Sequence, residues 1–131
     1  MSPGGRWLID GLYDVRDAGE VVALVVADTD QSQYVDSPIG SLALERAVSN
    51  FGEAANRLSK QARDFNPGFE AQHPELELRR AIKTRAVIVH DYDGIDRHLL
   101  WDTATGAIPR VTKQVDSLIL ELERAEGSLT L

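Results

Sequence analysis

The chain has 131 residues and a mass of 14.4 kDa, the size of one domain, residues 1–131, that buries a core without cross-links. It contains no cysteine, which excludes a disulfide framework and a thiolate metal site. Its formal charge of −7 argues against sequence-blind affinity for nucleic acid, because the neutralisation of phosphates drives most of that binding. Any contact with RNA must therefore be local.

The sequence shows no sign of a signal peptide or a membrane span. Its N-terminus, Met1-Ser-Pro-Gly-Gly-Arg6, lacks a long apolar run, and no later segment reaches about 18 apolar residues. We therefore expect a cytoplasmic protein that makes no contact with a membrane.

The first predicted element is a helix over residues 6–27. Its apolar positions are spaced by four and three, with Gly19 in the one gap, and are Leu8, Leu12, Val15, Val22 and Val26. A strand over Val21–Val26 is the alternative, because that run is β-branched and apolar on both faces. The helical spacing extends well beyond this run, so we predict the helix. Apolar residues on two faces imply two neighbours, for example one in the same chain and one across a dimer.

A second helix follows a polar connection over Asp28–Asp36. Ser37 is a suitable N-cap and Pro38 a suitable first helical residue. The helix has the most regular apolar spacing in the chain, at Leu44, Val48, Phe51, Ala55, Leu58, Ala62 and Phe65. Asn66-Pro67-Gly68 is expected to end it.

The remaining sequence predicts two further helical regions. One begins at Pro74-Glu75 and carries Leu78, Ile82, Arg85, Val89 and Tyr92 at helical spacing. The other runs from Ile95 to Gly127 and should be kinked or split where Thr105-Gly106 and Pro109 occur. The sum is an all-α bundle of four to five helices.

The stretch from Arg85 to Tyr92 concentrates a permanent cation, an imidazole and a phenol in eight residues, Arg85-Ala-Val-Ile-Val-His90-Asp91-Tyr92. On a helix Arg85 and Tyr92 share a face roughly 10 Å apart, whereas His90 points about 140° away from Arg85. Either the helix ends near Asp91 and turns His90 inward, or a second copy of the chain supplies the missing partner.

These residues suit metal-free cleavage of RNA. The three histidines, His73, His90 and His98, lack metal-binding spacing, and no phosphate-binding glycine loop occurs, so we expect neither metal nor cofactor. An arginine clamps a phosphate, and a histidine transfers a proton near neutral pH.

Structural roles are the alternative for the same residues. Arg85 could be an interhelical cation paired with Glu53, and Tyr92 could belong to the core. Arg79, Arg80 and Lys83 form a basic run that is either a solvated face or the place where an RNA backbone binds.

The Arg85-x4-His90-x-Tyr92 pattern resembles the motif of HEPN-domain proteins, and the chain around it resembles the HepT toxin branch of that superfamily. The Phe51-Gly-Glu-Ala54 segment, Leu58-Ser59, the run from Val89 to Asp96 with Leu100-Trp101, and Pro109 extend the match over residues 36 to 122.

The resemblance implies a helical homodimer whose two motifs meet in a cleft. It also implies a toxin–antitoxin pair in which a metal-independent ribonuclease is neutralised by a small nucleotidyltransferase of the MNT type. Arg85 would then stabilise the phosphate, His90 would be the general acid or base, and Tyr92 would be the site of AMPylation, with Glu53 and Asp91 in supporting positions.

Two positions depart from the family pattern. The family commonly has a small polar residue after the motif arginine, where this chain has Ala86, and the usual Pro-Trp pair is replaced at His73-Pro74-Glu75. The loss of a polar group at Ala86 bears on catalytic strength. It therefore leaves a second hypothesis, a non-catalytic HEPN subunit that binds and positions a nucleotidyltransferase.

Overall fold

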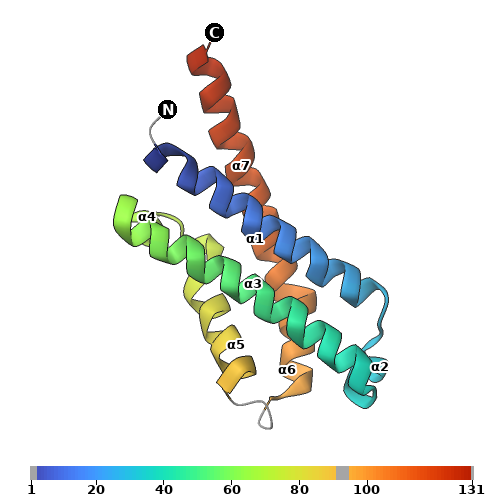
Figure 1. Cartoon of the computed structure of the whole chain (residues 1–131). Coiled ribbons are helices and arrows are strands. Elements are labelled where there is room, and N and C mark those ends of the chain that lie inside the picture. The colour runs from blue at the N-terminus through green and yellow to red at the C-terminus, as the bar shows by residue number, and fades with distance from the viewer. Residues whose placement is uncertain (1–2, 91–94, 131) are drawn as a thin grey trace.

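The computed structural model describes residues 3–90 and 95–130, with side chains over 6–90 and 95–127, and every regular element in these ranges is helical (Figure 1). The all-α prediction is therefore confirmed. The elements are α1 (Pro3–Ala27), α2 (Gln31–Asp36), α3 (Pro38–Phe65), α4 (Phe69–Gln72), the 3-10 turn η1 (Pro74–Leu76), α5 (Leu78–His90), α6 (Arg97–Asp102), the π-helical turn η3 (Thr103–Ala107) and α7 (Ile108–Thr130).

Helix α3 lies at the centre of the bundle. Helices α1 and α3 run antiparallel in one layer, and α5, α6 and α7 lie behind them (Figure 1). The predicted stripes of α1 and α3 form the core: Leu12, Val15, Leu44 and Leu58 are each at most 1% exposed. The strand alternative for Val21–Val26 is wrong, because the stripe of α1 continues through Val22. Among the described residues its second apolar face is exposed, and Leu24 is 67% exposed.

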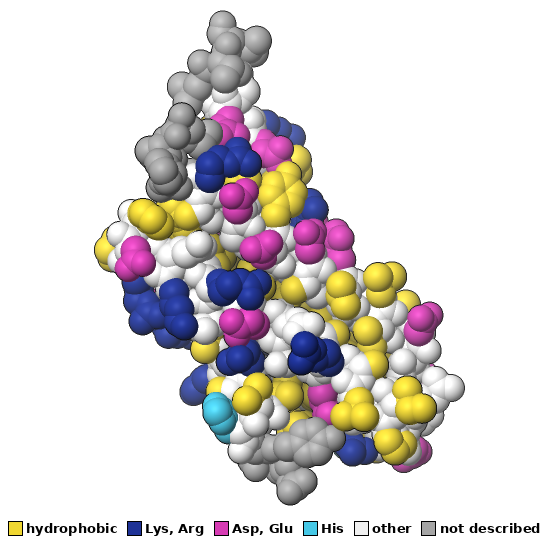
Figure 2. All heavy atoms as spheres, in the orientation of Figure 1, with side chains coloured by type: hydrophobic (Ala, Val, Ile, Leu, Met, Phe, Trp, Pro, Cys, Tyr) yellow, Lys and Arg dark blue, Asp and Glu magenta, His cyan; other side chains and the backbone are white. Residues whose placement is uncertain are grey.

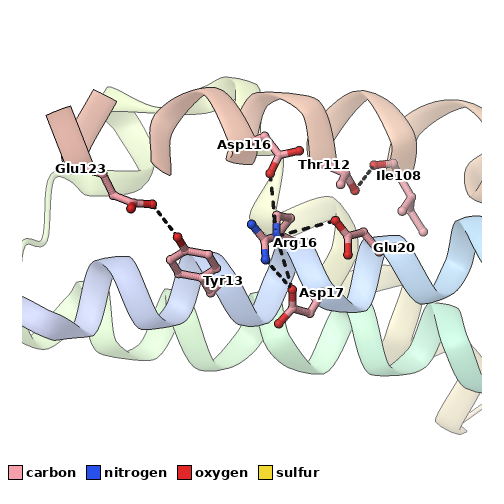
Figure 3. A network of polar contacts seen from close by, with 8 residues as sticks. All are labelled: Tyr13, Arg16, Asp17, Glu20, Ile108, Thr112, Asp116 and Glu123. Carbon is pink, nitrogen blue, oxygen red and sulfur yellow. Dashed lines mark hydrogen bonds and ion pairs between the residues drawn. The ribbon is translucent and has the colours of Figure 1, made fainter. Parts of the chain in front are cut away.

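Helices α1 and α7 are joined at a small residue, Gly19, and by a polar network, which Figure 3 shows. Gly19 is buried against Thr112 of α7, so the gap in the apolar stripe is where the two helices approach closely. The guanidinium of Arg16 lies 4.5 Å from the centre of the Tyr13 ring and within 3.8 Å of the carboxylates of Glu20 and Asp116. A cation between carboxylates and an aromatic face holds α1 on α7 at the edge of the apolar core.

Two predicted boundaries are wrong. The connection over Asp28–Asp36 contains α2, which a capping box between Asp30 and Gln33 begins and which buries Tyr34 against the Trp101 ring at 5.7 Å. A six-residue helix with one buried side chain leaves no periodic stripe in the sequence. The helix expected from Pro74 begins instead at Leu78, after η1 and a left-handed Glu77 with φ of 48°.

The split predicted in the last helical region is found, and the helix continues to Thr130 instead of ending at Gly127. Pro109 has no N–H to donate to the carbonyl of Thr105, so the α-helical ladder is interrupted there. The π-helical turn η3 lies immediately before this proline and carries the chain from α6 into α7.

The close packing of α5 on α3 depends on Gly52. A Cβ atom at Gly52 would lie 2.5 Å from the Cβ of Arg85 and 2.7 Å from the carbonyl oxygen of Ala81. Backbone and Cβ atoms of a helix cannot move aside as the end of a flexible side chain does. Glycine therefore fixes the separation of the two helices at the level of Arg85.

Replacement of Gly52 should separate these helices. We expect Gly52→Ala to destabilise the protein by about 1–3 kcal/mol, the usual cost of overpacking, as measured by urea unfolding followed by circular dichroism. Gly106→Ala is the matched control, because nothing lies within 4 Å of the added methyl group. Equal unfolding midpoints for the two variants would show that the contact at Gly52 carries no constraint.

Candidate functional site

Arg85 and Glu53 form an ion pair across the α3–α5 interface. The Nε atom of Arg85 lies 2.9 Å from Oε2 of Glu53, and the two side chains are 35% and 38% exposed. The other carboxylate oxygen of Glu53 lies 3.8 Å from the guanidinium of Arg57, one turn further along α3. The predicted pairing of Arg85 with Glu53 is thus present. Because a third of the Arg85 side chain is exposed, its guanidinium still has room for an external anion.

His90 is the last residue of α5 and is exposed to solvent. The helix ends there, as the first of the two alternatives expects, but the ring is exposed and is not turned toward the core. Five residues separate it from Arg85 on one regular helix, and the two side chains therefore point about 140° apart. Within one chain the cation and the imidazole are not brought together.

Asp91 and Tyr92 lie outside the described residues, as do Asp93 and Gly94. The supporting role of Asp91 and the modification site at Tyr92 therefore stay predictions. The described chain resumes at Ile95, and the Asp96 side chain accepts the N–H of Leu99 to cap α6.

Two members of the predicted basic run are already paired with carboxylates. Arg79 contacts Glu70 at 3.2 Å and the Ser59 hydroxyl at 3.3 Å, and Arg80 contacts Glu77 at 3.3 Å. Lys83 is exposed and forms no ion pair with any residue that the structure describes. The sequence has no acid between these cations, and the fold supplies the acids from the segment before α5.

Charge and apolar surface are separated on the face that α1 and α3 present. Figure 2 shows Lys and Arg side chains gathered where α3 passes α5, and Asp and Glu side chains along α1. Hydrophobic side chains gather over the C-terminal half of α1 and the N-terminal half of α3, where Leu24, Ile39 and Leu42 are exposed. Further exposed apolar residues, Val87 and Leu99, are at least 50% exposed on α5 and α6.

Glu77 fixes the start of the motif helix. Its carboxylate accepts hydrogen bonds from Arg110 of α7 at 2.7 Å and from Arg80 of α5 at 3.3 Å. These cations, Arg110 foremost, lower the pKa of Glu77 from its usual 4.5. Since the left-handed backbone of Glu77 is uncommon for a residue with a side chain, the two arginines hold a strained junction in place.

Acid should weaken this junction. A carboxyl group with a lowered pKa in the folded protein contributes stability above its usual value of 4.5 and loses it as the pH falls through the folded pKa. We expect Glu77→Gln to cost about 1 kcal/mol or less at neutral pH, because the pairs are partly exposed. That difference should shrink toward zero in acid, as measured by urea unfolding at several pH values.

Glu121→Gln, an exposed position on α7, is the control and should show no such trend. A Glu77→Gln difference that stayed constant from neutral pH to below the folded pKa would contradict the assignment.

The described residues contain no group of three or more histidine, aspartate or glutamate side chains placed to hold a metal ion. None of the helices within residues 3–90 and 95–130 combines the length and the apolar character that crossing a bilayer requires.

The fold and site define a class of protein: an all-α bundle that presents a partly exposed arginine and an exposed histidine on one short helix. The chain belongs to the HepT-like family, described as ribonuclease HepT-like, whose model matches residues 15–118. The matched range includes Glu53, Arg85 and His90, and it confirms the resemblance drawn from the motif.

Named relatives cover most of the chain. A Methanocaldococcus jannaschii protein named "Putative RNase MJ1380" is 27% identical over 105 residues, which are 80% of this chain and 90% of that one. A Thermococcus cleftensis protein named "Probable ribonuclease HepT" is 25% identical over 109 residues, 83% of this chain and 93% of that one. No solved structure matches the chain significantly.

The sequence missed three features of this site. The role of Gly52 could not be predicted, because it depends on which helix packs against this glycine, and the sequence does not show that this is α5. The carboxylates that pair with the basic run, Glu70 and Glu77, lie on elements that periodicity did not resolve. Arg57 shares Glu53 with Arg85, and its place one turn after Glu53 is the signal that could have identified it.

Proposed function

We propose that this protein is a metal-independent endoribonuclease and the toxin of a cytoplasmic HEPN/MNT toxin–antitoxin module. The observation that carries the proposal is the partly exposed Arg85, held by Glu53, on the helix that ends in an exposed His90. Relatives of this chain carry the name of ribonucleases. The two residue types supply the groups that RNA cleavage without a metal needs.

In the proposed reaction a ribose 2′-oxygen attacks the adjacent phosphorus and the bond from phosphorus to the 5′-oxygen breaks. The imidazole of His90 takes the proton of the 2′-hydroxyl as general base and then gives a proton to the leaving 5′-oxygen as general acid. The guanidinium of Arg85 stabilises the charge that develops on the phosphorane oxygens. The products are a 2′,3′-cyclic phosphate and a 5′-hydroxyl, so no water or metal enters the step.

The proposed active form is a homodimer. Arg85 and His90 of one chain diverge by about 140°, so a composite site takes the arginine from one protomer and the histidine from the other. Exposed apolar residues lie within the motif, at Val87 and Val89 on α5, and after it, at Leu99 on α6. A second copy would cover this surface, which is otherwise unfavourable in water.

Control of the enzyme is proposed to act on Tyr92. An MNT-type nucleotidyltransferase would transfer AMP to its hydroxyl, two residues after His90. The adduct is bulky and negatively charged, so it would occupy the place of the substrate phosphate beside Arg85 and block the cleft by sterics and charge together.

The second candidate is a non-catalytic subunit that binds and positions a nucleotidyltransferase. One observation favours it: Glu53 already neutralises Arg85 at 2.9 Å, and the next residue, Ala86, offers no hydrogen-bonding group. A wild-type chain that neither arrests growth nor cuts RNA when expressed without its partner would establish this candidate over the ribonuclease.

A site shared between two protomers can be tested by complementation between two inactive variants. Arg85→Ala and His90→Ala should each abolish growth arrest and RNA cleavage. A heterodimer of the two variants, isolated with two affinity tags, should regain about half of the wild-type rate, because a symmetric dimer then contains one rebuilt site of two. Arg124→Ala on α7 is the control and should keep wild-type activity. An inactive heterodimer of normal stability would contradict the sharing of the site.

Modification is tested by mass. Coexpression with the partner nucleotidyltransferase should add one or more whole AMP groups to the intact chain, and Tyr92→Phe should remove the addition while leaving cleavage by the free toxin intact. An adduct that persists in Tyr92→Phe, or an unmodified wild type that is nonetheless neutralised, would show that control acts elsewhere.

A further inference from the structure

We propose that α3 carries the binding track for the RNA backbone, formed by Arg46, Arg57 and Lys60. The proposal deepens the ribonuclease function proposed above and rests on it. It also moves the expected contact with phosphates away from the basic run of α5, where the sequence alone places it.

The three cations lie on one face of α3. Arg46, Glu53 and Lys60 are spaced by seven residues, so their side chains point in nearly the same direction, and Arg57 lies between the last two at a spacing of four and three. At 1.5 Å per residue the track extends over about 21 Å. It is long enough to follow several nucleotides of a strand.

These cations are available to a ligand. Arg46 and Lys60 are exposed and form no ion pair with the residues described in the structure, and Arg57 makes a single loose pair at 3.8 Å. On α5, by contrast, Arg79 and Arg80 are already neutralised by Glu70 and Glu77. A phosphate that binds a paired cation must displace a carboxylate, whereas a phosphate on α3 displaces only water.

The track passes over the proposed site. Glu53 is the only carboxylate between Arg46 and Lys60 on this face, and its charge is compensated by Arg85 at 2.9 Å. A bound strand therefore meets one unpaired cation at each end of the track and the Arg57–Glu53–Arg85 group between them. Placement on this line would bring the scissile phosphate to the exposed part of the Arg85 guanidinium.

The chemistry of the track points to single-stranded RNA. Separated cations along a convex helix bind an extended polyanion, not a compact nucleotide, which needs a pocket. In-line attack by a 2′-oxygen needs a backbone free to rotate, and base pairing restricts that rotation. An acidic protein surface is the competing class of ligand, and the experiment below separates the two.

The probe is a short, fluorescent, fully 2′-O-methylated oligonucleotide, which lacks the attacking hydroxyl and so reports binding without cleavage. Binding is measured by fluorescence anisotropy over a range of salt concentrations. Each of three substitutions should weaken binding roughly three- to tenfold at low salt: Arg46→Ala, Arg57→Ala and Lys60→Ala. Each should also reduce the slope of log binding constant against log salt concentration by about 0.7. Lys113→Ala and Arg124→Ala, exposed cations of α7, are the matched controls and should change neither quantity.

Each outcome decides the proposal. The proposal is overturned if the wild type does not bind the oligonucleotide, or if the α3 variants bind it as the wild type does while Lys83→Ala weakens binding. It is also overturned if the α3 substitutions weaken binding to an acidic protein partner and leave binding to the oligonucleotide unchanged. A separate assay with unmodified RNA tests the proposed function: lost binding in the α3 variants without cleavage by the wild type would leave the track standing and remove the ribonuclease.

Discussion

The site of this protein depends on the contact of two helix backbones at Gly52. Because no side chain separates α3 from α5 there, the Cβ of Arg85 lies directly on α3, and Glu53 is in reach of the guanidinium from the next position along the chain. The packing of α3 against α5 therefore also fixes the position of the Arg85 guanidinium beside Glu53. The same contact that closes the interior sets where the motif arginine emerges from it.

Periodicity was sufficient for the elements that bury a long stripe. Helices α1 and α3 follow from the spacing of Leu12, Val15, Leu44 and Leu58, and the start of α3 follows from the chemistry of its Ser37 cap. The helix α2 was missed because one buried residue, Tyr34, makes no period. Its capping pair, Asp30 and Gln33, was nevertheless present in the sequence as a local signal.

The site was only partly predictable for a related reason. Spacing along α5 gives the direction of His90 relative to Arg85, but the absolute direction depends on how the helix packs and where it ends. The exposed His90 at the last turn could not be deduced from its neighbours in sequence. The pairing of Arg79 with Glu70 likewise joins segments whose relation is set by η1 and Glu77, where the backbone adopts a conformation that no apolar pattern indicates.

The segregation of charge changes what the total of −7 means for RNA. Helices α3 and α5 together carry eight Lys and Arg residues and three Asp and Glu residues, whereas Asp and Glu outnumber Lys and Arg on α1 and on α7. At physiological ionic strength the field of a surface charge fades over about 8 Å, less than the 10–12 Å diameter of a typical helix. An RNA strand close to the protein surface is therefore affected mainly by the charges of the nearest helix. Repulsion from the acidic helices α1 and α7 turns the RNA toward the basic helices. The negative net charge therefore selects the orientation in which RNA approaches the protein.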